Sequence, residues 1–151
     1  MTEYFSEEGL ERLKQELEEL KTSKRHEIAA RLEHAKSLGD LSENAEYQEA
    51  KEEQSLLESR IVEMEETLRN AVIIKKDTRS DLVQIGSTVR VKSEHGEETF
   101  TIVGSEEADP KEGKISNESP LGKSFLGKKA GDTVEVKTPG GGVHYSISAI
   151  A

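Results

Sequence analysis

Two apolar stripes with helical spacing, separated by only a few residues, constrain the fold of this chain most. The first runs from Leu10 to Ala35 at steps of three and four, with a stutter after Leu20 where steps of four adjoin. The second runs from Tyr47 to Ala71 at the same steps. Two helices of about 30 residues, each about 45 Å long, can bury such narrow stripes only against each other. The pattern predicts an antiparallel coiled-coil hairpin with its tip at residues 38–42.

The ends of the first helix have recognisable signals. Ser6 is a suitable N-cap, and Glu7 and Glu8 follow it in the first turn, where the helix dipole favours acids. Gly39 can supply the left-handed residue that ends the helix. We therefore expect the first helix to run from Ser6 to about Ser37.

Beyond residue 76 the apolar spacing changes from helical to alternating, which is typical of strands. We expect strands around Val89 and Val91, over residues 98–103 and 133–137, and, after a turn at residues 139–142, over residues 143–150. Ser119-Pro120, followed by Gly127, has the N-cap, N1 proline and C-terminal glycine of a short helix. The chain is thus predicted to be α+β, with a helical hairpin domain at residues 1–76 and a small β-rich domain at residues 77–151.

Composition limits the function classes. There is no cysteine and no apolar stretch of the length that a membrane span needs, and the N-terminus is acidic, so we expect a soluble, cytoplasmic protein without disulfides. The net charge is −10, with 19 acids and 12 bases in residues 1–76. Nucleic-acid phosphates repel such a chain. We expect contact with DNA or RNA only where another protein brings the chain to it.

The segment Gly39-Asp40-Leu41-Ser42-Glu43-Asn44-Ala45-Glu46-Tyr47, expected at the tip, is the most informative one. Asp40-x-x-Glu43 has the spacing of a capping box, with Ser42 as a competing cap, and spacing alone favours this structural interpretation. However, the segment also gathers three acids at the end of a long arm, and capping does not need such a cluster.

The same nine residues resemble the signature of the Gre transcript-cleavage factors. Further similar stretches occur in the same order along the chain, at residues 21–31, 119–122, 126–128, 131–134 and 137–141. The resemblance therefore spans essentially the whole chain. It implies that the C-terminal domain has a fold similar to FK506-binding proteins and docks on the rim of the secondary channel of bacterial RNA polymerase, while the hairpin enters that channel.

The resemblance also assigns roles to residues at the tip. Asp40 and Glu43 match the two acids that help to hold a second Mg²⁺ ion and its water in the polymerase active site, where the polymerase hydrolyses backtracked RNA near its 3′ end. Two carboxylates are only part of a magnesium site. The chain is therefore expected not to be an enzyme by itself and not to bind Mg²⁺ stably when alone.

Further residues of this chain match positions that have roles in the Gre family. Lys36 and Lys51 stand where basic residues contact RNA, although the first is commonly arginine, and the small number of bases on the hairpin favours the GreA type over the GreB type. Glu118, Ser119 and Pro120 resemble the polymerase-docking loop, but Ser119-Pro120 is equally a good helix start.

For several other residues a structural interpretation is favoured. Tyr47 is expected to pack at the seam of the hairpin rather than to stack on a base. The four histidines are too scattered to predict a zinc site. The remaining bases of the first helix are expected to form a solvated helix face: Lys21, Lys24, Arg25 and Arg31.

Three alternative functions make different demands on the sequence. A non-cleaving inhibitor of the secondary channel would not need the Asp40–Glu43 pair. A prolyl isomerase would need an apolar cleft rich in aromatic residues, and this chain is only 4% aromatic without tryptophan. A self-assembling coiled coil would need apolar surface outside the hairpin seam. The resemblance thus implies a transcript-cleavage factor, and a monomer is the simpler expectation for its oligomeric state.

Overall fold

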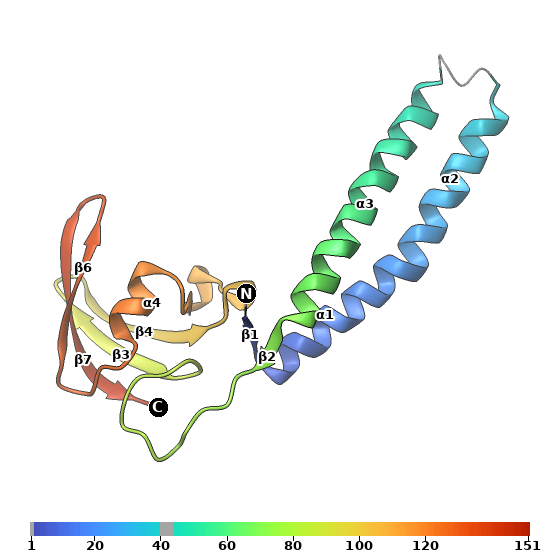
Figure 1. The fold of residues 1–151 in the computed structure, drawn as a ribbon. Helices are drawn as coiled ribbons and strands as arrows, with labels where there is room; N and C mark the ends of the chain where they lie inside the picture. Colours follow the sequence, from blue (N-terminus) through green and yellow to red (C-terminus); the bar gives the residue numbers. More distant parts are fainter. Residues whose placement is uncertain (1, 40–43) are drawn as a thin grey trace. The chain divides into compact units, whose positions relative to one another are not determined.

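The computed structural model describes residues 2–39 and 44–151, which form two compact units. One unit is the helical hairpin, Leu10–Asn70, and the other joins the segment up to Gly9 with Ala71–Ala151. Figure 1 shows the hairpin helices and the β-rich unit. The N-terminal segment thus belongs with the β-rich unit, while the division into domains at residues 1–76 and 77–151, with separate roles, stays a prediction. In the described part of the chain, no helix is long and apolar enough to cross a membrane.

The first arm of the hairpin is interrupted by one wide turn. It consists of α1 (Glu7–Glu19), a π-helical segment η1 (Leu20–Lys24) and α2 (Arg25–Ser37). In η1 the N–H of Arg25 donates to the carbonyl oxygen of Leu20, five residues earlier. Such a turn contains one residue more than an α-helical turn, and it lies where the sequence has its stutter. The extra residue therefore brings the second half of the stripe back to the same face.

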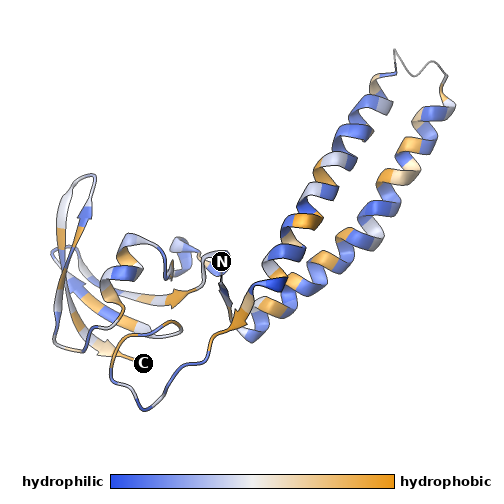
Figure 2. Ribbon diagram, in the orientation of Figure 1, coloured by the Kyte–Doolittle hydropathy of each residue, from blue (hydrophilic) through white to orange (hydrophobic). Residues whose placement is uncertain are grey.

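The two arms bury a narrow apolar seam. The second arm is one helix, α3 (Ala45–Arg69). Figure 2 shows apolar residues on the helices of this unit among mostly hydrophilic ones. The seam confirms the predicted hairpin, and its buried side chains are Leu17, Ile28, Leu57, Ile61 and Met64, with Leu13, Leu20, Leu32 and Leu68 packed against them.

The segment before α1 forms a strand that the sequence did not predict. β1 (Glu3–Phe5) pairs in parallel with β2 (Ala71–Ile73), which follows α3. Ser6 is the N-cap of α1, as expected, because its Oγ accepts a hydrogen bond from the N–H of Gly9 at 3.0 Å. The N–H and Oγ of Ser6 also donate to the carboxylate of Glu107 at 2.7 and 2.6 Å. These bonds fix the start of α1 within the β-rich unit.

The β-rich unit is built on a five-stranded sheet in the order β5-β4-β3-β7-β6. All neighbours in this sheet are antiparallel except β4 and β5. The strands and the helix α4 match the predicted elements, although β5 was not predicted and β7 begins earlier, at Gly141. The bounds are β3 (Thr88–Ser93), β4 (Gly96–Val103), β5 (Lys114–Ser116), β6 (Thr133–Thr138), β7 (Gly141–Ile150) and α4 (Pro120–Phe125), with short 3-10 turns η2 (Ser105–Glu107) and η3 (Pro110–Glu112) between β4 and β5.

The core of this unit lies between the sheet and α4. Phe125 of α4 is fully buried, and its ring lies 6.0 Å from that of Phe100 and 5.7 Å from that of Tyr145. Two of the few aromatic side chains are therefore in the core. The other buried members are Val83, Val89, Val91, Ile102, Ile115, Val134 and Ile147.

Candidate functional site: the hairpin tip and the docking loop

The first arm of the hairpin ends as its glycine predicts. After the last α2 residue, Ser37, the N–H of Leu38 donates to the carbonyl oxygen of Ala35 at 3.1 Å. Gly39 then adopts a φ of 112°, in the left-handed region that favours glycine. The expected helix end at Gly39 is therefore confirmed.

The second arm begins later than the capping-box spacing predicts. The N-cap of α3 is Asn44, whose side-chain oxygen accepts a hydrogen bond from the N–H of Tyr47 at 3.2 Å. The prediction of a cap at Asp40 or Ser42 was wrong, because the helix starts at Ala45. The preference of asparagine for N-cap positions is a sequence signal that would have identified Asn44. The start of α3 thus has its cap without the acidic pair.

Asp40 and Glu43, the predicted catalytic and metal-binding acids, lie outside the described residues. They belong to the segment 40–43 that links Gly39 to Asn44. Among residues 2–39 and 44–151, no group of three or more His, Asp or Glu side chains could hold a metal ion. Carboxylate oxygens are ligands that Mg²⁺ prefers, so the chemistry of the acidic pair fits the metal that the resemblance implies.

The two lysines predicted to contact RNA flank the tip and are exposed. Lys36 is in the last turn of α2, and Lys51 is in the second turn of α3. The ammonium of Lys51 lies 5.8 Å from the ring centroid of Tyr47, one turn earlier on the same helix. This distance allows a cation–π attraction. The half-buried Tyr47 thus contacts Lys51 from the side of the tip.

Four other bases of the first arm are paired with acids, and three of these acids lie on α3. Arg25 donates two hydrogen bonds to Glu58, at 3.0 and 2.8 Å, and these bonds lower the pKa of Glu58. Arg31 donates to Glu53. Residues 20–37 hold five bases and two acids, whereas residues 45–69 hold eight acids and three bases. The sequence predicts a solvated helix face for these bases, whereas in the structure each has an acidic partner; the remaining pairs are Lys21–Glu65 at 3.8 Å and Lys24–Glu27 at 3.6 Å.

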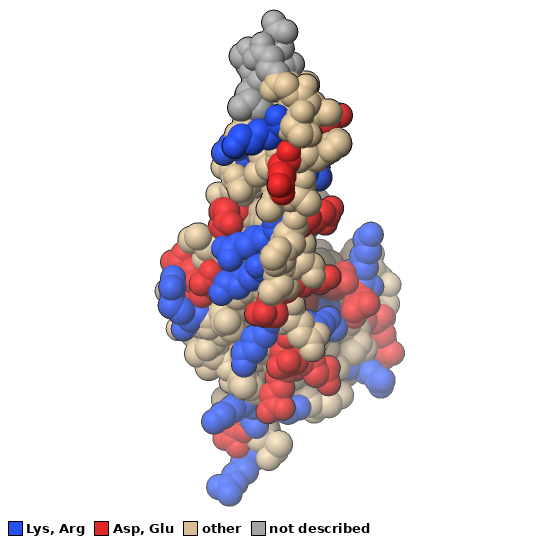
Figure 3. All heavy atoms as spheres, turned by 90° about the vertical axis from the view of Figure 1, so that its right-hand side faces the viewer, with Lys and Arg blue, Asp and Glu red and all other residues tan. Residues whose placement is uncertain are grey.

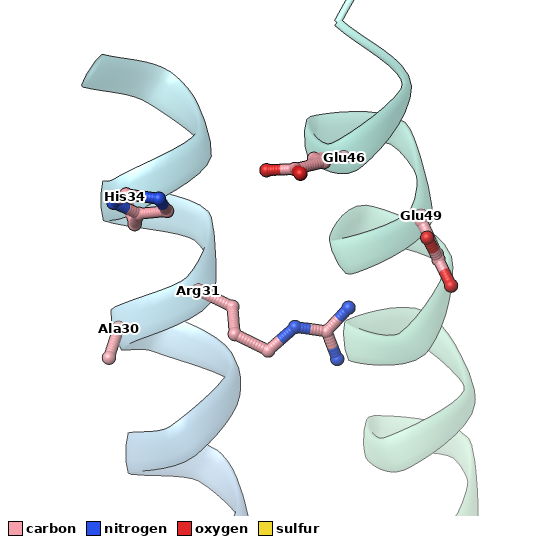
Figure 4. Close-up of a pocket in the computed structure, with 5 residues that line it drawn as sticks. All are labelled: Ala30, Arg31, His34, Glu46 and Glu49. Atoms are coloured by element: carbon pink, nitrogen blue, oxygen red, sulfur yellow. The ribbon is translucent and has the colours of Figure 1, made fainter. Parts of the chain in front are cut away.

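Figure 3 shows basic and acidic side chains interspersed along the hairpin, a pattern that leaves no broad surface of one sign in this view. Below the tip, a cavity of about 450 Å³ lies between α2 and α3. In Figure 4 the guanidinium of Arg31 extends toward α3, and the carboxylate of Glu46 points toward α2. The cavity is lined by Ala30, Arg31, His34, Glu46 and Glu49. Because Arg31 is paired with Glu53 and the cavity is also lined by Glu46 and Glu49, it is a poor anion site.

The predicted docking residues lie at the start of α4. Ser119 is the N-cap: its Oγ accepts from the N–H of Gly122 at 3.0 Å and donates to the carbonyl oxygen of Ser116 at 2.7 Å. Pro120 occupies the first turn and is exposed. The local role of Ser119-Pro120 as a helix start is thus confirmed, while docking stays a prediction.

Glu118 has an acidic neighbourhood that sequence reasoning missed. Its carboxylate accepts a hydrogen bond from Ser105 at 2.9 Å. The pKa of Glu3 in β1 is raised, first by burial and then by the charges of Glu106 and Glu118. No local sequence signal indicates this grouping, because it depends on β1 lying against η2, a segment about 100 residues away along the chain.

An apolar groove of about 410 Å³ lies beside the same loop. Pro120 and Leu121 form part of its wall, and Tyr145 is its only aromatic lining residue among the described ones. Ile115, Val136 and Pro139 contribute further apolar surface, and Lys114 and Lys137 also line it. The groove is thus apolar, but it has little of the aromatic lining expected of a prolyl isomerase site.

Comparison with known proteins gives matches over both units. A family model described as "Transcription elongation factor, N-terminal" matches residues 3–73, and one described as "Transcription elongation factor, GreA/GreB, C-term" matches residues 78–151. Among curated proteins, transcription elongation factor GreA of Geobacillus kaustophilus is 53% identical over 149 residues, covering 97% of this chain and 94% of that protein. GreA of Bacillus subtilis is 53% identical over 146 residues, covering 95% and 93%.

Solved structures also match along the full length. The crystal structure of GreA factor homolog 1 (Gfh1) of Thermus thermophilus is 28% identical, covers 100% of this chain and 99% of that chain, and has a TM-score of 0.45. Another structure, titled as that of the transcription factor Gfh1, is 28% identical with a TM-score of 0.48, covering 99% and 97%.

A helical hairpin followed by a small β-rich unit, with matches in both parts, defines a transcription elongation factor. The chain belongs to the GreA/GreB family. As a member of this family it is a transcription factor and not an enzyme by itself, as the sequence led us to expect.

Proposed function

We propose that this chain stimulates bacterial RNA polymerase to cleave backtracked nascent RNA and so returns arrested complexes to elongation. Close relatives named GreA, matched over nearly their whole length, are the observation that carries this proposal. Asp40 and Glu43 are both present in the sequence, and α3 has its N-cap in Asn44. The acids are therefore available for a role other than capping that helix.

In this proposal the tip acids complete a site that belongs to the polymerase. Asp40 and Glu43 supply carboxylate oxygens, and the hairpin carries them to the end of the RNA through the secondary channel. Mg²⁺ bound there would polarise the phosphodiester and lower the pKa of the attacking water. Because two carboxylates are too few ligands for a stable magnesium site, the chain alone should leave RNA intact.

Lys36 and Lys51 are the proposed contacts to the backtracked RNA. Both are exposed and lie on the two arms near the tip. A lysine attracts phosphate but cannot form the bidentate hydrogen bonds of arginine. The affinity for RNA is therefore expected to be modest. Contact with RNA or DNA occurs in this proposal only inside the polymerase complex, because the free chain carries a net charge of −10.

Glu118, Ser119 and Pro120 are the proposed docking residues on the rim of the channel. An exposed proline next to an apolar groove and an acidic cluster gives this loop both shape and charge for binding a protein. Docking through protein contacts also explains how an acidic chain can act at an enzyme that binds nucleic acid. We propose that the chain acts as a cytoplasmic monomer.

The experiment is to add the purified chain to a stalled, backtracked bacterial elongation complex with Mg²⁺. The expected result is that the RNA is shortened from its 3′ end and that the complex then resumes elongation. Pro120→Ala should raise the concentration needed for half-maximal cleavage without changing the maximal rate. If the wild-type chain binds and the RNA keeps its length while synthesis stops, the chain is an inhibitor of the channel instead.

A further inference from the structure

The two arms of the hairpin are joined near the tip by one side chain. Asn44 lies at the start of α3, and its amide nitrogen donates a hydrogen bond to the carbonyl oxygen of Ala35 in the last turns of α2. Its amide oxygen accepts from the N–H of Tyr47. A single half-buried side chain thus bonds the end of one helix and the beginning of the next.

This double contact requires a carboxamide. The side chain must donate to one backbone group and accept from another, and only asparagine and glutamine combine both functions in a planar group. Serine and aspartate cap helices about as well as asparagine. However, an ionised aspartate cannot donate, and the shorter serine side chain would not span the two arms. Capping alone therefore does not explain the choice of residue.

Near the tip, the apolar seam contributes little to holding the two arms of the hairpin together. The buried residues nearest the tip on the two arms are Ala35 and Ala50, at 2% and 1% exposure. The large buried side chains, such as Ile28 and Leu57, lie farther from the tip along the helices. Small side chains give little area to hold two helices together. The bond from Asn44 to Ala35 therefore carries more of the restraint here than it would elsewhere in the hairpin.

We infer that Asn44 is a positioning residue for the tip acids. Gly39 and Asn44 are the two ends of the segment that contains Asp40 and Glu43, and the bond to Ala35 sets how far apart those ends can move. This inference rests on the proposed function, because it assumes that the acids act in cleavage. Misplacement of a reacting group by about 1 Å can cost on the order of a hundredfold in rate. A loosened tip should therefore lower the cleavage rate although every catalytic group is present.

The test compares Asn44→Ser with the wild-type chain, and Asn44→Ala serves as a variant without cap or bridge. Asn44→Ser should retain the helical content and the concentration for half-maximal cleavage. Its maximal cleavage rate should fall by about tenfold to a hundredfold. Since the chain has no cysteine, Ser37→Cys and Gln48→Cys allow spin labels on the two arms. The distance between the labels should become more widely distributed in Asn44→Ser.

Each other outcome has a definite meaning. A wild-type maximal rate in Asn44→Ser, or an unchanged label distribution, overturns the inference. If the cleavage rate falls only because helical content is lost, Asn44 acts as a helix cap alone, and the inference is overturned as well. If Asp40→Ala cleaves normally, the proposed function itself fails, whereas inactive Asp40→Ala with fully active Asn44→Ser refutes only the positioning role.

Discussion

The hairpin should depend on Ile61 more than on any exposed residue of α3. Ile61 is 1% exposed and packs with Leu17, Ile28, Leu57 and Met64 in the seam. Replacing a buried isoleucine by alanine removes three carbon atoms and leaves a cavity, at a cost of about 2–5 kcal/mol. Because natural domains have about 5–15 kcal/mol of stability in total, this loss is a large fraction of it. We expect Ile61→Ala to unfold at clearly lower urea concentration.

The adjacent residue is a matched control. Val62 is 62% exposed on the same helix, and alanine has the better helix propensity by a few tenths of a kcal/mol. Val62→Ala should therefore unfold at the wild-type urea concentration or slightly above it. The helical signal in circular dichroism follows the hairpin, which contains all the long helices. Equal midpoints for Ile61→Ala and the wild-type chain would refute the seam as the source of hairpin stability.

Three further predictions follow from other parts of the molecule. Hydrogen bonds from Arg25 lower the pKa of Glu58. The stabilisation by this pair is therefore present above the ordinary glutamate pKa and is lost as the pH falls. When unfolding of the hairpin is followed as a function of pH, Glu58→Gln should lack this contribution. In Gly104→Ala the added Cβ would lie 1.8 Å from the carbonyl oxygen of Tyr4, so hydrogen exchange in β1 should accelerate. In Gly140→Ala the added Cβ would be in ordinary contact with Thr138 Oγ1 at 3.9 Å, so exchange should stay unchanged. A prolyl isomerase assay on a tetrapeptide should show no acceleration by the purified chain, and a clear acceleration would revive that alternative.

The long elements could be predicted because their patterns are local. The stripes of α1, α2 and α3 and the alternation in β3, β4, β6 and β7 each repeat within one segment. The π turn at Leu20–Lys24 was visible only as a stutter in the spacing. Pairing of β1 with β2 could not be predicted, because two three-residue strands about 70 residues apart carry too little pattern.

The sequence predicts which residues form the candidate site, and their roles stay a prediction, but it indicates little of the geometry around them. The tip motif drew attention to Asp40 and Glu43, but it did not distinguish Asp40 from Asn44 as the helix cap, since both residue types cap well. The bond from Asn44 to Ala35 joins two helices, so it appears only when the arms are placed side by side. The acidic surroundings of Glu118 likewise depend on tertiary contacts with Glu3.

In the proposed function, two carboxylates of this chain act within the polymerase. The most direct measurement is the rate of RNA cleavage in backtracked complexes saturated with Asp40→Ala, Glu43→Ala or Glu46→Ala. Glu46 is a third acid of the tip motif, exposed at the start of α3, and serves as the control. If the two acids have the proposed role, the first two variants bind polymerase but do not stimulate cleavage, while Glu46→Ala remains active. Normal cleavage by both Asp40→Ala and Glu43→Ala would contradict it.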